Sequence, residues 1–223
     1  MKNQIIRLIK PALATLTVML APLVWCGTTL AHDSDSAQFF GSKELLAVFE
    51  DTYWRWVPAF GNGNVTLPKD ENGNALLAGV ALMPYPNLPD GINGTVDVTF
   101  RVGQPFFMPL IGLFGTSYTG GTPPPDPFVD VFEEKKLKLK LKLDGKTILD
   151  EDDARDFFSK SRFDPPIPYN QFGVDSIIWF EGLGVLHRPL APGKHVLKLD
   201  ETLPVPAFGF TIEYHVTFNV TVE

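Results

Sequence analysis

The four histidines, His32, His187, His195 and His215, are the side chains best suited to bind a transition metal in this sequence. His32 directly follows Ala31, the end of a small-x-small tripeptide that a signal peptidase accepts. Cleavage there would give His32 a free α-amine, which together with the imidazole can chelate copper in a brace. A second histidine would complete that brace. A copper-binding or copper-dependent oxidative protein is therefore one function that the sequence permits, with copper as its cofactor.

The other three histidines lie in the last quarter of the sequence. His187 and His195 flank Pro192-Gly193, which we interpret as a hairpin turn, so the two rings could face each other across it. His215 lies on the polar face of the last predicted strand and, with an acid such as Glu213, could add ligands to a shared metal site. Hydrogen-bonded or solvent-facing histidines near turns are the simpler interpretation, and we favour it.

A long proline-rich loop over residues 115–127 is the second candidate site. Loops of this length without secondary structure of their own are often functional. Pro123, Pro124 and Pro125 limit the entropy lost on docking, and Tyr118 offers an aromatic contact. No residue pattern identifies a catalytic triad, and Ser117 lacks the flanking residues of a nucleophile elbow. The sequence thus favours a non-catalytic binding or structural role, with no cofactor unless copper binds.

Residues 1–31 have the pattern of an export signal. Basic Lys2, Arg7 and Lys10 precede an apolar run that Pro22 interrupts. That run is shorter than the ~20 residues a membrane-spanning helix needs, so we expect no membrane span. The alternative is a lipid anchor on Cys26, although Trp25 stands where lipidation sites have a small residue. We expect a periplasmic or secreted protein that begins at His32.

The amino-acid composition limits the classes of partner that we expect. The formal net charge is −7, and removing residues 1–31, which carry three bases and no acid, would lower it to −10. Such a protein repels nucleic acid, so we expect none as a partner and instead expect an extracytoplasmic ligand or protein. Cys26 is the only cysteine, and export would remove it with the signal, which excludes disulfides and thiolate metal sites from the mature chain.

The mature chain is predicted to contain a flexible tether at residues 32–41 and one domain at residues 42–223. An amphipathic helix should run from Ser42 to Val57, with Leu45 and Trp56 on its apolar face and Trp54 exposed. A short internal helix should follow the acids at 150–153. The remainder alternates apolar runs with turns, which is typical of β-structure.

The strand signals are strongest near the C-terminus. Over residues 210–222, apolar side chains occupy every second position, as in a sheet with one buried face. Residues 135–143 alternate Lys and Leu, and residues 104–114 form an apolar strand with Pro109 at an edge or bulge. About seven such strands and two helices predict an all-β fold, an antiparallel β-sandwich, with a closed barrel as the alternative.

Several short motifs resemble a family of secreted bacterial proteins with no established activity. They are Trp54-Arg-Trp56, Gly103-Gln-Pro-Phe-Phe-Met-Pro-Leu110, Leu143-Asp-Gly-Lys146 and Pro189-Leu-Ala-Pro-Gly-Lys-His195. The last motif, followed by the alternating strand, is the most specific. The resemblance implies export and a β-sandwich, and it supplies no catalytic residue. The cysteines that many such proteins carry before the Pro-Phe-Phe strand are missing here.

Overall fold

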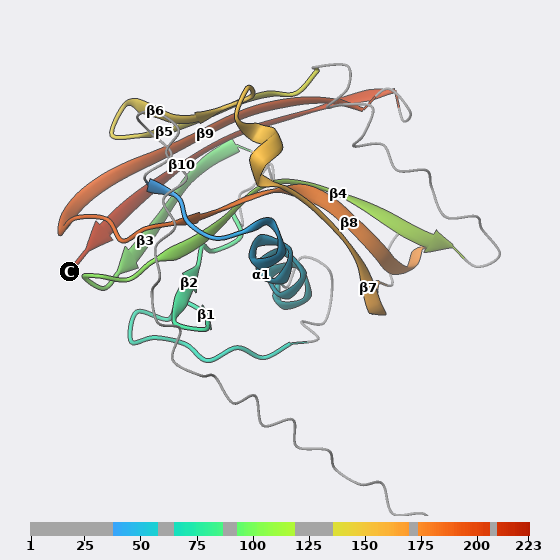
Figure 1. Ribbon diagram of the computed structural model, residues 1–223, viewed down its shortest axis with the longest axis horizontal. Helices are drawn as coiled ribbons and strands as arrows, with labels where there is room; N and C mark the ends of the chain where they lie inside the picture. Colours follow the sequence, from blue (N-terminus) through green and yellow to red (C-terminus); the bar gives the residue numbers. More distant parts are fainter. Residues whose placement is uncertain (1–37, 58–64, 87–92, 119–135, 170–173, 206–208) are drawn as a thin grey trace, which may run out of the picture. The chain divides into compact units, whose positions relative to one another are not determined.

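The computed structural model describes residues 38–57, 65–86, 93–118, 136–169, 174–205 and 209–223, and all of them belong to one compact unit. They form one α-helix, one short 3₁₀-helix and two five-stranded sheets that face each other (Figure 1). Apolar side chains from the facing sides of both sheets make the larger of two core clusters. The predicted β-sandwich is confirmed, with the helix as a third layer.

The first sheet has the strand order β1-β2-β4-β8-β7. Its strands are β1 (Leu76–Leu77), β2 (Val80–Leu82), β4 (Phe106–Tyr118), β8 (Val174–His187) and β7 (Phe158–Pro168). The long pairs β4–β8 and β8–β7 are antiparallel. The short β2 pairs with β4 only at Phe106 and Phe107, and a bulge follows at Pro109, where the sequence predicted an edge or a bulge.

The second sheet has the order β3-β10-β9-β5-β6. Its strands are β3 (Asn93–Phe100), β10 (Phe210–Val222), β9 (Gly193–Val205), β5 (Lys138–Leu143) and β6 (Lys146–Asp150). β3 runs parallel to β10, as β2 does to β4, so both sheets are mixed rather than wholly antiparallel as predicted. The reason is that alternation marks which side chains are buried but carries no information about the direction of the neighbouring strand.

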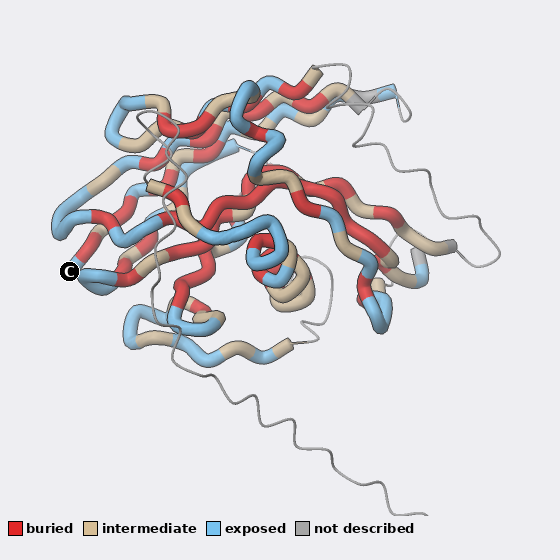
Figure 2. Tube along the Cα trace, viewed as in Figure 1, coloured by how far each residue is buried: buried red, intermediate tan, exposed pale blue. Residues whose placement is uncertain are grey.

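The alternation of apolar and polar residues along each strand determines which side chains are buried in the core. On β10, Val216, Phe218, Val220 and Val222 are buried between the sheets, and the intervening residues lie at the surface or are partly exposed (Figure 2). Leu139 and Leu141 of β5 are buried in the same way, with lysines on the opposite face. Burying such side chains is worth roughly 1.5–3 kcal/mol each, so these faces fix the register of the sheets.

Helix α1 (Lys43–Trp56) lies against the outer side of the first sheet (Figure 1). Ser42 caps it by accepting a hydrogen bond from the amide of Leu45. Its buried stripe consists of Leu46, Phe49, Glu50, Tyr53 and Trp54. The sequence interpretation was wrong here in three places, because Trp54 is buried, Trp56 is only half-buried and Leu45 is exposed. The stripe is centred on Glu50, an acid that the apolar pattern had left out.

The end of the predicted tether belongs to the packed domain. Phe39 is buried against the ring of Phe157, and the backbone at Gln38 and Phe40 bonds to the end of β8. The packed chain therefore starts at least four residues before residue 42. The short internal helix is a 3₁₀-helix, Ala154–Phe157, following the acids as predicted. Within the described residues, no helix is long and apolar enough to cross a membrane.

Candidate ligand-binding site

A pocket of about 160 Å³ lies beside the part of β4 that is no longer paired with β2. β2 leaves the sheet at Leu82, so the described part of β4 beyond Phe107 has no strand partner on that side. The chain continues through Pro84, Tyr85 and Pro86, which form one side of the pocket. Met83, just after β2, also contributes, and the rest of the lining comes from α1, from β4 and from the inner faces of β9 and β10: Trp54, Pro109, Leu110, Ile111, Gly112, Phe114, Glu201, Ile212, Tyr214 and Phe218.

Aromatic rings form much of this lining. Trp54 meets Phe114 edge to face, with ring centroids 4.8 Å apart, and meets Tyr85 at 6.5 Å. The absence of a side chain at Gly112 lets this strand lie close to the helix. A Cβ atom at Gly112 would lie 3.1 Å from Trp54 Cζ2. The second sheet contributes further lining, including Tyr214 and Phe218 of β10.

Glu201 is the only acidic side chain among the described residues of the lining. It lies on β9 in the inward-facing series Leu197, Leu199, Glu201 and Leu203, so it occupies a place where the pattern calls for leucine. The side chain is only 2% exposed, and neither carboxyl oxygen has a hydrogen-bond partner within the described chain. Burial raises the pKa of Glu201 well above its usual 4.5.

The direct neighbour of Glu201 on β10 is Tyr214, and its neighbour on β5 is the apolar Leu139. Burial raises the pKa of the Tyr214 phenol, and the nearby Tyr85 and Glu201 raise it further. The pKa of Tyr85 is also raised, first by burial. Both phenols therefore stay neutral at physiological pH. A buried carboxyl group without a partner is costly, which makes Glu201 the residue of this pocket that most needs a functional explanation.

A second buried carboxyl group, Glu50, lies at the helix–sheet interface. Trp54 Nε1 donates a hydrogen bond of 2.7 Å to Glu50 Oε2, whereas Oε1 and the buried hydroxyl of Tyr53 have no partner among the described residues. Burial raises the pKa of Glu50 to about 8, although the bond from Trp54 acts in the opposite direction. Through that bond Glu50 fixes the orientation of the indole that forms one side of the pocket.

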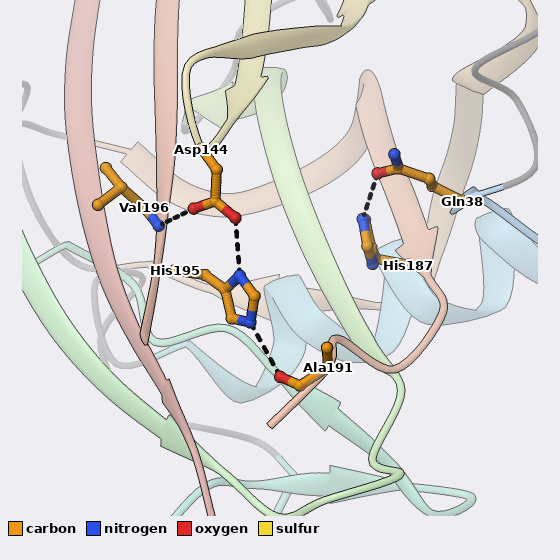
Figure 3. Close-up of polar contacts among 6 residues, drawn as sticks. All are labelled: Gln38, Asp144, His187, Ala191, His195 and Val196. Carbon is orange, nitrogen blue, oxygen red and sulfur yellow. Dashed lines mark hydrogen bonds and ion pairs between the residues drawn. The ribbon is translucent and has the colours of Figure 1, made fainter. Parts of the chain in front are cut away.

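The three described histidines, His187, His195 and His215, do not form one metal-binding group, because the expected hairpin joins two different sheets. β8 ends at His187 in the first sheet, and β9 begins at Gly193 in the second. The two rings consequently have separate partners (Figure 3). His187 contacts the carbonyl oxygen of Arg188 and, at 3.2 Å, the side-chain oxygen of Gln38. Burial lowers the pKa of His187.

His195 holds the start of β9 to the β5–β6 turn. Its Nδ1 lies 2.8 Å from Asp144 Oδ2, and its Nε2 lies 2.9 Å from the carbonyl oxygen of Ala191 (Figure 3). Asp144 Oδ1 also accepts from the amide of Val196. The bond to Asp144 raises the pKa of His195, whereas burial lowers it. These contacts join two of the short motifs, at 143–146 and 189–195, in one structural connection.

His215 lies apart from both on the outer face of β10, where its Nδ1 is 2.9 Å from Asp200 Oδ1. Among the described residues, no three His, Cys, Asp or Glu side chains are grouped so that they could hold a metal ion. His32, Pro123, Pro124 and Pro125 lie outside those residues, and of Tyr118 only the backbone at the end of β4 is described. The copper brace and the proline-rich binding loop thus stay predictions.

A shallow depression on the outer face of the second sheet is a weaker candidate. It is about 280 Å³ in volume and is lined by charged groups of both signs. Several of those groups pair with one another, as in Lys138–Glu151 at 3.7 Å and His215–Asp200 at 2.9 Å, and the buried Glu201 also borders the depression. Exposed pairs of this kind contribute little to stability, and their opposite charges offset each other. The described surface therefore points to the aromatic pocket instead.

Sequence interpretation missed both Glu201 and Glu50, although each carries a readable signal. Glu201 replaces an apolar residue in a strand whose other inward positions are all leucine between 197 and 203. Glu50 lies one helical turn from Leu46 and from Tyr53, so the spacing places it on the buried stripe. A charged residue at a core position is the pattern that identifies both.

Comparison with known proteins does not assign this chain to a family. No family model and no curated protein matches this chain. Among solved structures, the solution structure of amebosin is similar over 60% of this chain and 93% of its own, at 13% sequence identity and a TM-score of 0.22. A TM-score this low supports no conclusion about fold or function.

Proposed function

We propose that this protein is an exported, non-catalytic binding protein that holds a small organic ligand in the aromatic pocket at the free edge of β4. The observation that carries the proposal is a cavity of about 160 Å³ lined by aromatic and aliphatic side chains together with one buried carboxyl group. A few polar groups within a mostly apolar lining are the usual composition of small-molecule sites. A cavity of roughly 150 Å³ is large enough to hold a benzene ring.

The position of the pocket supports the same proposal. Its lining draws on the helix, on both sheets and on the segment after β2, so the pocket is built by the fold as a whole. Most of these side chains project from helix and strands, which hold a site more rigidly than loops do. Export is supported by the basic, apolar and small-residue regions of residues 1–31 and by the resemblance to secreted proteins.

The test is to block the pocket from one of its sides. Ile212 lines it from β10, whereas the neighbouring Thr211 is exposed on the opposite face of the same strand. Calorimetric titration with 3,3-dimethylbutan-1-ol and with choline, which have the same shape, should detect binding to the natural protein. We expect Ile212→Phe to abolish that binding and Thr211→Phe to leave it unchanged. Failure of both probes to bind, or equal binding in the two variants, would exclude the pocket as the site.

A further inference from the structure

We propose that the ligand of the aromatic pocket is a small organic cation, an alkylammonium or quaternary ammonium compound, whose charge is neutralised by Glu201. This inference rests on the proposed function and adds the chemical class of the ligand. It starts from the charges that the pocket presents. Among the described lining residues there is no Lys, Arg or His, and the one acidic group is Glu201. An anionic ligand would therefore meet an acid and no counter-charge.

The state of the Glu201 side chain points to a cation as its partner. The group is buried between two sheets, and both oxygens lack a hydrogen-bond donor within the described residues. A carboxyl group in such a place is stabilised when an opposite charge enters its surroundings. An ammonium group supplies that charge, and a leucine at position 201, matching its neighbours, would have no such interaction.

The aromatic side chains suit the remainder of the ligand. Trp54, Tyr85 and Tyr214 line the same pocket as Glu201. Trp and Tyr rings attract cations through the negative potential of their faces, and desolvation strengthens that attraction. Trp54 is held in place by the bond from its Nε1 to Glu50 Oε2, so its ring is positioned before any ligand arrives. Methyl or methylene groups next to a nitrogen would fill the apolar volume that these rings leave.

Choline and 3,3-dimethylbutan-1-ol test this inference, because they differ only in nitrogen replacing a quaternary carbon and hence in charge. We expect the natural protein to bind choline at least about tenfold more tightly than the alcohol. Glu201→Gln keeps the size and removes the charge, so it should abolish that preference while the alcohol binds as before. Glu213→Gln is the matched control, since it removes an acid from the exposed face of β10 beside Tyr214.

The pH dependence gives a second readout. The titratable groups facing the pocket from the described elements are Glu201 on β9, Tyr214 on β10 and Tyr85 after β2, and both phenols stay neutral near pH 7. Choline must compete with the proton on Glu201, so its affinity should rise with pH by up to about tenfold per unit. The affinity for the alcohol should not change with pH.

The outcomes separate the two proposals. Failure of both probes to bind would overturn the binding function, and the cation inference with it. Binding of the alcohol with choline no tighter, or an unchanged choline preference in Glu201→Gln, would overturn the cation inference and leave the binding function standing. Because Gln resembles the protonated acid, we expect Glu201→Gln to fold, and retained binding of the alcohol demonstrates that it has.

Discussion

At the scale of single residues, Glu50 makes the stability of the fold depend on pH. Its carboxyl group is fully buried on the sheet-facing side of helix α1, and burial raises its pKa from 4.5 to about 8. The folded state therefore keeps this proton at pH values where the unfolded chain has lost it. The contribution of Glu50 to the free energy of unfolding is fully present below about pH 4.5. It is lost as the pH rises towards 8, by at most about 1.4 kcal/mol per pH unit.

We expect Glu50→Gln to remove this dependence, because the amide cannot ionise but can still accept from Trp54 Nε1. The free energy of unfolding, measured with urea between pH 5 and 8, should fall with rising pH in the natural protein and less steeply in the variant. The raised pKa of Glu201 also lowers the stability of the fold as the pH rises. Burial lowers the pKa of His187, so this residue raises the stability as the pH rises. The difference between the two proteins isolates Glu50, and parallel curves would contradict the prediction.

At the scale of elements, two closely spaced glycines of β8 allow close packing, Gly184 against helix α1 and Gly182 against the backbone of β4. A Cβ atom at Gly184 would lie 2.0 Å from Glu50 Oε1 and 2.8 Å from the Phe107 ring. A Cβ atom at Gly182 would meet the backbone of β4, 2.4 Å from the carbonyl oxygen of Ile111. Side chains at either position would force the neighbouring elements apart.

Gly184→Ala should therefore lower the free energy of unfolding by about 1–3 kcal/mol. Glu50→Ala removes one of the two clashing groups and leaves the ring of Phe107 in place. In a double-mutant cycle the combined variant should be more stable than the sum of the single changes implies, by about 1 kcal/mol. Chemical denaturation of the four proteins measures this coupling, and strict additivity would mean that the helix does not approach β8 as described.

Some features of the strands could be predicted from the sequence, and others could not. The strand at 210–222 and the leucine face of residues 137–141 were predicted because alternation is set locally by burial. The parallel pairing of β3 with β10, and the separation of β8 from β9 into two sheets, depend on contacts between distant segments. The pocket could not be predicted for the same reason, since its location follows from where β2 stops pairing with β4.

At the scale of the whole molecule, the export signal predicted in residues 1–31 bears on which N-terminus the working protein has. The pattern of residues 1–31 predicts that the exported protein begins at His32 and contains no cysteine. Intact mass spectrometry of protein recovered from outside the cytoplasm measures this directly. A mass that retains Cys26 with acyl chains would instead indicate a lipid-anchored protein, and the free amine that a copper brace needs would then be absent.

The pairing of β10 also governs when the second sheet can form. β10 lies between β3 and β9, and Asn219 of β10 bonds to Asp97 of β3, a residue 122 positions earlier in the chain. β3 therefore has to wait for a partner that is synthesised much later, and contacts of such long sequence separation form slowly. The second sheet can therefore be completed only after β10 has been synthesised, and until then β3 is without the one strand that it pairs with among the described residues.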